Sequence, residues 1–524
     1  MSLEEFLHHL HVDIDKVSPP DWEVDWEDAP LSYKLYRCSS IVPLSLEVPL
    51  TLEGWESSKN PNLRKIGHFL WYTFGLNQIS QSVLSSDPIT QAADFMSYRR
   101  FVPSGGALYP NELYVYLKLK DLPDGVYHFD AAHHRLVLLR EGNFDSYINQ
   151  ALGNRCDLST CFGTVFVSTM FWKNFFKYNN LAYRLQGLDA GVLIGQLLEV
   201  AKRFGFESGV YFQFLDQAVN HLLGLSDQEE SVYAVIPLSV EQTNWFFYDS
   251  GNDDTTTAAE LCRELGSIHH HHYVKSQRIK EYPMLTKMNQ ASMIESTRSF
   301  REFRAQKRSD YVGESLILPR VERLSYDFAS VCRKRYSPDM DFVLGKVTRL
   351  QLAGLLLEAT ASFSYRNDLD GAHQKSVDRV SLYGCLHHVE GIPDGAYYYD
   401  STAHVLRQVQ LGDHRLQLQY GMALDNVNLF QVPLCLHVAG DKDHFRSQLG
   451  YRGYRIQQME AGMLVQRLLL TSSAIGMGGH PLLGFDVNIC DQIYRMDLQD
   501  KTSLIQVPIG PYRPRPWLTG SLHS

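Results

Sequence analysis

The sequence predicts an α+β fold built from two copies of one domain. Three observations support this prediction: an internal repeat, a long helical pattern in each copy, and short β-rich stretches around each of those patterns. The chain has 524 residues, of which 44% are hydrophobic and 21% are charged, as in ordinary globular proteins. A chain of this length is also expected to form more than one domain.

The repeat is visible in two motifs that recur at a nearly constant distance. The string PDGVYHFD at 123–130 returns as PDGAYYYD at 393–400, which is 270 residues later. The string YRLQGLDAG at 183–191 returns as YRIQQMEAG at 454–462, which is 271 residues later. A spacing this long excludes a solenoid and indicates a duplicated domain.

The boundary between the copies is expected near a polar segment. The stretch 248–257 (YDSGNDDTTT) has the composition of an exposed loop, and the run 258–265 could form a short helix. We therefore divide the chain into an N-terminal extension 1–27, a first domain 28–247, a linker 248–289 and a second domain 290–524.

Each copy is predicted to contain one long helix surrounded by strands. Apolar residues at helical spacing predict helices over 185–204 and 456–475, and each helix is followed by a glycine, the usual residue at a helix end. Shorter β-rich stretches predict strands at 113–117, 125–129, 164–168, 232–236, 382–386, 395–399, 432–437 and 503–508. This mixture gives the α+β class.

Composition excludes several kinds of protein. The 49 Lys and Arg against 59 Asp and Glu give a net charge of −10, which argues against a nucleic-acid binder. The longest apolar runs, such as 192–200, are far shorter than the ~20 residues of a membrane span. The acidic, His-rich start of the chain does not resemble a secretory signal. The eight cysteines form no CxxC pair, so neither a zinc site nor a disulfide framework is expected, and a cytoplasmic location is the default.

The segment 100–114 (RFVPSGGALYPNELY) is the most unusual local string. Its adjacent glycines, Gly105 and Gly106, carry no Cβ and allow the backbone to approach a ligand closely. The alternative is a purely structural turn before the strand at 113–117.

This string resembles part of a known family. Together with GVYHFD at 125–130 and Lys177-Tyr178, it resembles the SagB-type, thiazoline-oxidase branch of the FMN-dependent nitroreductase family. The second copy adds GMGG at 476–479 and VPIG at 507–510, in the order that branch shows. The resemblance covers roughly 28–240 and 290–516. It implies two tandem nitroreductase-like α+β domains that form an intramolecular pseudo-dimer and bind FMN between the copies.

The resemblance also implies which residues hold FMN. In this family one partner supplies an Arg-Ser-x-Arg phosphate clamp, a late Gly-Gly and a basic C-terminal residue, and the other partner supplies the Pro-Ser turn. The clamp residues here would be Arg298, Ser299, Arg301, Gly478, Gly479 and Arg513, and the turn residues Pro103, Ser104, Gly105, Gly106 and Leu108. Guanidinium groups match phosphate oxygens well. A register around Ser296, or a solvated helix face after Arg298, stays open.

The two copies have kept complementary parts of this set. The first copy has FES at 206–208 instead of Gly-Gly, and the second has KSVDRVSLY at 375–383 instead of the turn. We therefore expect one functional FMN site per chain, with the symmetry-related site empty or decayed.

Lys177 and Tyr178 are the candidate catalytic pair. In azoline-oxidising members of the family a Lys-Tyr at this place is linked to catalysis, whereas the second copy has Gln448-Leu449, which cannot transfer protons. A lysine serves as a base only if burial or a neighbouring cation lowers its pKa from ~10.4. The alternative is a surface lysine beside a core tyrosine.

The expected function is therefore an FMN-dependent oxidase or dehydrogenase. Its most specific form is an oxidase that converts thiazoline or oxazoline rings of a modified peptide to azoles, with hydride transfer to FMN and reoxidation by O2. Three alternatives stay open: an NAD(P)H-dependent nitro- or quinone reductase, a dehydrogenase of another natural-product intermediate, and a flavin-free pseudo-dimer that binds a peptide. Partner biosynthetic enzymes and a homodimer also stay open.

Two charged or His-rich segments are not expected to be sites. The four histidines at 269–272 are adjacent and cannot all face one point, so we expect an exposed linker rather than a metal site. The acidic pairs Glu229-Glu230 and Asp253-Asp254 are expected to be solvated loop charges.

Overall fold

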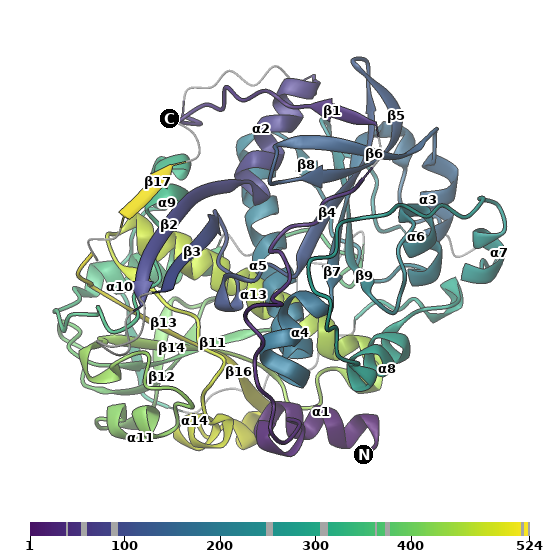
Figure 1. Cartoon of the computed structure of the whole chain (residues 1–524). Coiled ribbons are helices and arrows are strands. Elements are labelled where there is room, and N and C mark those ends of the chain that lie inside the picture. The colour runs from purple at the N-terminus through teal and green to yellow at the C-terminus, as the bar shows by residue number, and fades with distance from the viewer. Residues whose placement is uncertain are drawn as a thin grey trace.

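The computed structural model of the chain describes residues 1–37, 40–53, 60–84, 93–247, 255–303, 313–361, 364–371, 378–514 and 518–521. We call the residues up to 247 the first half and those from 290 the second half. Two long central helices, α5 (Ala182–Arg203) and α13 (Arg452–Ala474), pass between the sheets of the two halves (Figure 1).

Each half contains a seven-stranded antiparallel sheet. The order in the first half is β1-β6-β5-β4-β7-β9-β8, and in the second half it is β10-β13-β12-β11-β14-β16-β15. The strands of the first sheet are β1 (Ile41–Pro43), β4 (Asn111–Leu119), β5 (Leu122–Asp130), β6 (Arg135–Glu141), β7 (Cys161–Met170), β8 (Glu207–Ser208) and β9 (Glu230–Ser239). Those of the second are β10 (Ser315–Ile317), β11 (Ser381–Leu386), β12 (Gly395–Asp400), β13 (Val405–Leu411), β14 (Leu434–Asp441), β15 (Gly478–Gly479) and β16 (Lys501–Gly510). The two orders correspond strand for strand, so the sequence repeat is also a structural repeat.

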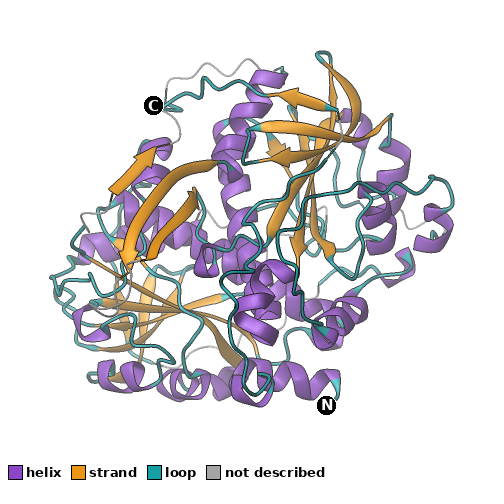
Figure 2. Ribbon diagram, viewed as in Figure 1, coloured by secondary structure: helices purple, strands orange, loops and turns teal. Residues whose placement is uncertain are grey.

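Helices and a small third sheet complete the fold (Figure 2). The helices are α1 (Leu3–Val12), α2 (Leu63–Phe74), α3 (Asp145–Ala151), α4 (Trp172–Tyr178), α5 (Ala182–Arg203), α6 (Asp216–Leu223), α7 (Ala258–Cys262), α8 (Pro283–Ser292), α9 (Phe328–Lys334), α10 (Arg349–Ala361), α11 (Arg415–Tyr420), α12 (Arg446–Leu449), α13 (Arg452–Ala474) and α14 (Val487–Tyr494). The third sheet has the order β17-β2-β3, from Leu518–Ser521, Leu76–Leu84 and Ala93–Arg100. It therefore joins the end of the chain to the first half.

The central helices α5 and α13 pack tightly because glycines bring their backbones together. A Cβ on Gly191 would overlap the main chain of Met459, and a Cβ on Gly462 would overlap that of Leu188. Further along the helices, Gln466 donates a 2.8 Å hydrogen bond to Gln196. One hydrophobic core cluster contains buried side chains of both halves, so the halves share an interior.

The helix α1, at the start of the first half, and the helix α8, at the start of the second half, each pack on the opposite half. From α1, His11 Nε2 lies 2.8 Å from Thr502 Oγ1 in the second half. From α8, Ser292 Oγ lies 3.2 Å from Tyr183 OH in the first half. This exchange interlocks the two halves.

The sequence predictions of fold class and elements are confirmed. All eight predicted strands overlap a strand of the two large sheets, and the two predicted long helices correspond to α5 and α13. The predicted short helix is α7, whereas 248–254, including Asp253-Asp254, lies outside the described residues. None of the described helices is long and apolar enough to cross a membrane.

Two minor expectations are corrected by burial. Glu230 is not a solvated charge: it is 2% exposed and lies 2.6 Å from the amine of Lys34, because it begins the buried strand β9. The His269–His272 segment is not fully exposed either, since His270 and His272 pack edge-on against Tyr36. Among the described residues, no group of three or more His, Cys, Asp or Glu is arranged to hold a metal ion.

Candidate active site

A cavity of about 540 Å³ lies between the two halves beside the central helices. The first half contributes the turn 103–106, the last residues of α4 and one face of α5. The second half contributes the segment 480–484 and small and apolar residues of α13. The volume and the largely apolar wall are typical of sites for small organic ligands.

Gly106 brings the backbone of the turn close to the ends of two side chains of α4. Gly106 has φ of 64°, in the left-handed region that favours glycine. A Cβ at this position would lie 2.7 Å from Tyr178 OH and 2.9 Å from Lys177 Nζ. The predicted turn and the predicted catalytic pair are therefore direct neighbours.

The head groups of Lys177 and Tyr178 are available to a ligand. Neither Lys177 Nζ nor Tyr178 OH has a hydrogen-bond or carboxylate partner in the part of the chain that the structure describes, and both residues line the cavity. Lys177 Nζ lies 5.3 Å from the Trp26 ring and 4.9 Å from the Tyr178 ring, distances that suit cation–π contact. The rings of Trp26 and Tyr178 thus position the Lys177 amine at the cavity without supplying a negative charge to pair with it.

Burial tunes these two groups in opposite ways. It lowers the pKa of the Lys177 amine from its ordinary value, because the charged form loses hydration. Burial, with a smaller contribution from the negative charge of Asp189, raises the pKa of Tyr178. The tyrosine is therefore a hydroxyl donor at neutral pH, and the lysine is a more accessible base than a free lysine.

Ser104 is held by hydrogen bonds within the protein. Its hydroxyl donates to Asp189 Oδ2 at 2.6 Å and accepts from the backbone N–H of Tyr109 at 2.9 Å. The backbone N–H of Gly105 donates to the other carboxylate oxygen of Asp189 at 3.3 Å. Asp189, on α5, therefore anchors the whole turn.

Asp189 is the functional candidate that sequence analysis missed. It is 8% exposed, lines the cavity and forms no ion pair with any described residue. Burial raises the pKa of its carboxyl to about 7, against the lowering effect of Ser104 and Gly105. The only sequence signal was its place before Ala190-Gly191 in the repeat, where the second copy has Glu460.

The predicted glycines Gly478 and Gly479 lie next to the cavity rather than in its wall. A Cβ on Gly478 would overlap Pro338, and His480, which follows Gly479, does line the cavity. Arg513 donates its backbone N–H to Asp341 O at 2.9 Å, and its side chain is exposed. These residues hold the segment 337–341 against the site. Leu108 follows the turn and approaches Gly106 but is not among the lining residues.

The predicted phosphate clamp is not brought to this cavity. The backbone of Arg301 exchanges two 2.8 Å hydrogen bonds with the side chain of Gln213, and Arg298 Nε donates to Thr255 Oγ1 at 2.9 Å. Neither these arginines nor Ser299 lines the cavity that contains Ser104. The physical reason is the buried Phe300, which packs under Arg155 and fixes the segment on the first half.

A second Arg and Ser pair, Arg335 and Ser337, lies at the edge of the cavity: Ser337 lines it, and Arg335 contacts Ser337 without lining the cavity itself. Arg335 Nη1 donates to Ser337 Oγ at 3.3 Å, and its Nε donates to Phe101 O, two residues before the turn, at 3.2 Å. Ser337 lines the cavity, and Arg335 forms no ion pair with any described carboxylate. Burial lowers the pKa of Arg335. The signal in the sequence was the short basic run RKRYS at 333–337.

The symmetry-related place in the other copy is filled by charged side chains. Glu460 stands where Asp189 stands in the first copy, and Arg379 contacts both of its carboxylate oxygens, at 2.6 and 2.9 Å. Tyr365 OH donates to Glu460 at 2.6 Å, and Arg379 also pairs with Asp370 at 2.5 Å. A guanidinium thus occupies the space beside this carboxylate, which the first copy leaves open.

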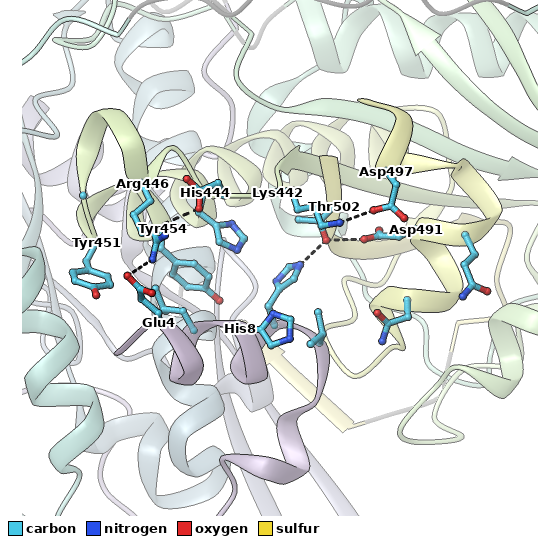
Figure 3. Close-up of a pocket in the computed structure, with 17 residues that line it drawn as sticks. Glu4, His8, Lys442, His444, Arg446, Tyr451, Tyr454, Asp491, Asp497 and Thr502 are labelled. Carbon is cyan, nitrogen blue, oxygen red and sulfur yellow. Dashed lines mark hydrogen bonds and ion pairs between the residues drawn. The ribbon is translucent and has the colours of Figure 1, made fainter. Parts of the chain in front are cut away.

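A second cavity, of about 480 Å³, lies between α1 and the second half and contains none of the predicted site residues (Figure 3). Its wall includes an ion pair between Glu4 and Arg446 at 2.6 Å. Asp491 accepts hydrogen bonds from Thr502 Oγ1 and from the backbone N–H of Ser503, both at 2.8 Å.

Comparison with known proteins identifies the fold. Residues 72–238 match the model of the nitroreductase family. The chain has a nitroreductase-like α+β fold in both halves: it superposes on a putative nitroreductase from Anabaena variabilis with a TM-score of 0.73 at 19% identity, covering 98% of this chain and 99% of that one. The chain therefore contains a nitroreductase family domain, which indicates an oxidoreductase.

One curated relative matches part of the chain. The trifolitoxin-processing protein TfxB of Rhizobium leguminosarum bv. trifolii is 27% identical over 159 residues, which are 29% of this chain and 43% of that protein. The match thus spans less than half the length of the relative.

Proposed function

We propose that the chain is an FMN-dependent oxidoreductase that oxidises azoline rings of a modified peptide to azoles. The observation that carries the proposal is the pair of unpartnered head groups, Lys177 Nζ and Tyr178 OH, beside Gly106 in a cavity of about 540 Å³. The relative named as a trifolitoxin-processing protein supports a peptide substrate.

The residues of the cavity fit a flavin. Leu185 and Leu188 of α5 provide an apolar wall for the ring system. Arg335 does not line the cavity itself but donates to Ser337, which does, and its half-buried guanidinium has no carboxylate partner among the described residues, which suits the phosphate. We therefore assign the phosphate to Arg335 and Ser337, and not to Arg298, Ser299 and Arg301. FMN, when bound, would accept a hydride from a carbon of the substrate.

Lys177 and Tyr178 would handle the protons of the reaction. Oxidation of an azoline ring removes one proton from a ring carbon, together with a hydride from its neighbour. Burial favours the neutral amine of Lys177, which can take that proton. Tyr178 stays protonated and can donate a hydrogen bond to the heteroatom of the ring.

One FMN per chain is expected. The second symmetric place holds Arg379 against Glu460, and Gln448 and Leu449 stand where Lys177 and Tyr178 stand in the first copy. Inserting a ligand there would leave a buried guanidinium or carboxylate unpaired, which is costly.

The test is flavin quantification combined with turnover. Purified protein should be yellow, with one FMN per chain. Lys177→Ala should keep the flavin but lose at least about 100-fold in turnover of an azoline peptide, the usual size of a general-base contribution. Arg335→Ala should lower FMN affinity, whereas Arg301→Ala, the matched control, should not. Colourless protein, two FMN per chain, or turnover with NADH but not with azoline peptides would contradict the proposal.

A further inference from the structure

Asp189 and Ser104 are joined by the shortest hydrogen bond of the turn, and the Ser104 hydroxyl has no hydrogen left to offer a ligand. A hydroxyl carries one hydrogen and two lone pairs. The hydrogen is directed at Asp189 Oδ2, 2.6 Å away, and one lone pair accepts from the N–H of Tyr109. An ionised carboxylate can only accept, so while Asp189 is charged this arrangement is fixed.

Protonation of Asp189 would reverse the bond. The carboxylic acid could then donate to Ser104 Oγ, using the remaining lone pair of the hydroxyl. The hydrogen of Ser104 would be free to turn into the cavity and donate to a bound molecule. We propose that Asp189 and Ser104 form a positioning pair in which a proton on Asp189 releases the Ser104 hydroxyl to a ligand of the cavity.

The surroundings of Asp189 allow this change. The titratable groups that line the same cavity are Lys177 and Tyr178 from α4, and Asp339 and His480 from the second half. None of them forms an ion pair with Asp189, and His480 is turned toward Asp339 at 3.1 Å. Burial raises the pKa of Asp189 to about 7, so both protonation states are accessible near neutral pH.

The symmetric carboxylate lacks this freedom. Glu460 is contacted by the guanidinium of Arg379 and by Tyr365 OH, so its charge is compensated and no hydroxyl can be released. The exchange of hydrogen bonds between Asp189 and Ser104 therefore has no counterpart at Glu460.

The sign of the effect follows from charge. An anionic ligand such as FMN disfavours the charged form of Asp189, so binding would raise its pKa further and take up a proton. The affinity for FMN should then fall as the pH rises above about 7. Ionisation of Asp189 should lower this affinity by up to about tenfold per pH unit, in addition to any pH dependence that comes from the ionising groups of FMN. This inference rests on the proposed function because FMN is the probe.

The experiment is FMN titration of the full chain, freed of flavin by dialysis, by fluorescence quenching between pH 5.5 and 9. Asp189→Asn cannot ionise, so its affinity should follow pH less steeply than that of the unmodified protein. Ser104→Ala should lose affinity at low pH only. Asp491→Asn is the matched control, because Asp491 also accepts from a hydroxyl and a backbone N–H but lies in the other cavity.

The outcomes separate the two claims. A steeper fall with pH in the unmodified protein and in Asp491→Asn than in Asp189→Asn supports the inference. Equal slopes, or an affinity that rises with pH, overturn it while leaving the proposed function intact. If no variant binds FMN at any pH although all melt cooperatively, the proposed function fails, and the inference fails with it.

Discussion

At the scale of single residues, the cavity depends on groups that are usually costly to bury. Lys177 and Asp189 are both ionisable, both line the cavity and have no ion-pair partner among the described residues. Unpaired buried charges destabilise a fold unless their pKa shifts toward the neutral form. Both shifts run in that direction, which is the pattern expected of a site maintained for chemistry rather than for stability.

Gly106→Ala should weaken flavin binding strongly. The new Cβ would stand within 3 Å of both Lys177 Nζ and Tyr178 OH, and the positive φ adds a strain of about 1 kcal/mol. Gly391→Ala separates the two effects, because Gly391 has φ of 65° but open space around it. Thermal melting should show a similar small loss in both variants, with FMN titration changed only in Gly106→Ala. A normal FMN affinity in Gly106→Ala would argue against a ligand at this turn.

At the scale of elements, the sequence predicted the regular parts better than the site. Helical spacing and β-rich composition located α5, α13 and eight strands, because burial imposes these patterns locally. The turn 103–106 and Lys177-Tyr178, each a contiguous string in the sequence, line one cavity in the structure, and their roles stay predictions. The predicted clamp does not line the cavity that contains Ser104, because the buried Phe300 fixes the RSFREF segment on the first half. Arg335 and Asp189 were not singled out, because their sequence signals are weak and their contacts with the turn join segments far apart in the chain.

The helix pair α5–α13 should be intolerant of side chains at its glycines. In Gly462→Ala the new methyl group would overlap the main chain of Leu188, so the helices must separate. Overpacking of this kind costs about 1–3 kcal/mol. Chemical denaturation should show that loss, and Gly266→Ala, at a glycine with nothing within 4 Å, should not. Equal stability of the two variants would mean that the helices are not in close contact.

At the scale of the whole molecule, the two halves form one interlocked body. Buried side chains of both halves share one hydrophobic cluster, and α1 and α8 each pack on the opposite half. The cavity itself needs both halves, because its turn comes from the first and the segment 480–484 from the second. The site can therefore form only after both domains have folded against each other.

Phe6→Ala in α1 should destabilise the second half more than the first. Phe6 is fully buried, and such a truncation costs about 3–5 kcal/mol. Hydrogen exchange should increase in α14 and in β16, against which α1 packs. His8→Ala, at an exposed position on the same helix, is the control. Faster exchange confined to the first half would contradict the exchanged packing of α1.

The exchange of α1 has a consequence for biosynthesis. The helix α1 is translated before residues near 440–502, on which it docks. Until those residues are made, the apolar face of α1, which includes Phe6 and Leu10, lacks the neighbours that bury it in the folded protein. The native contacts of α1 can therefore form only once residues near 502 have been made, and a chain cut short before them would leave Phe6 and Leu10 exposed.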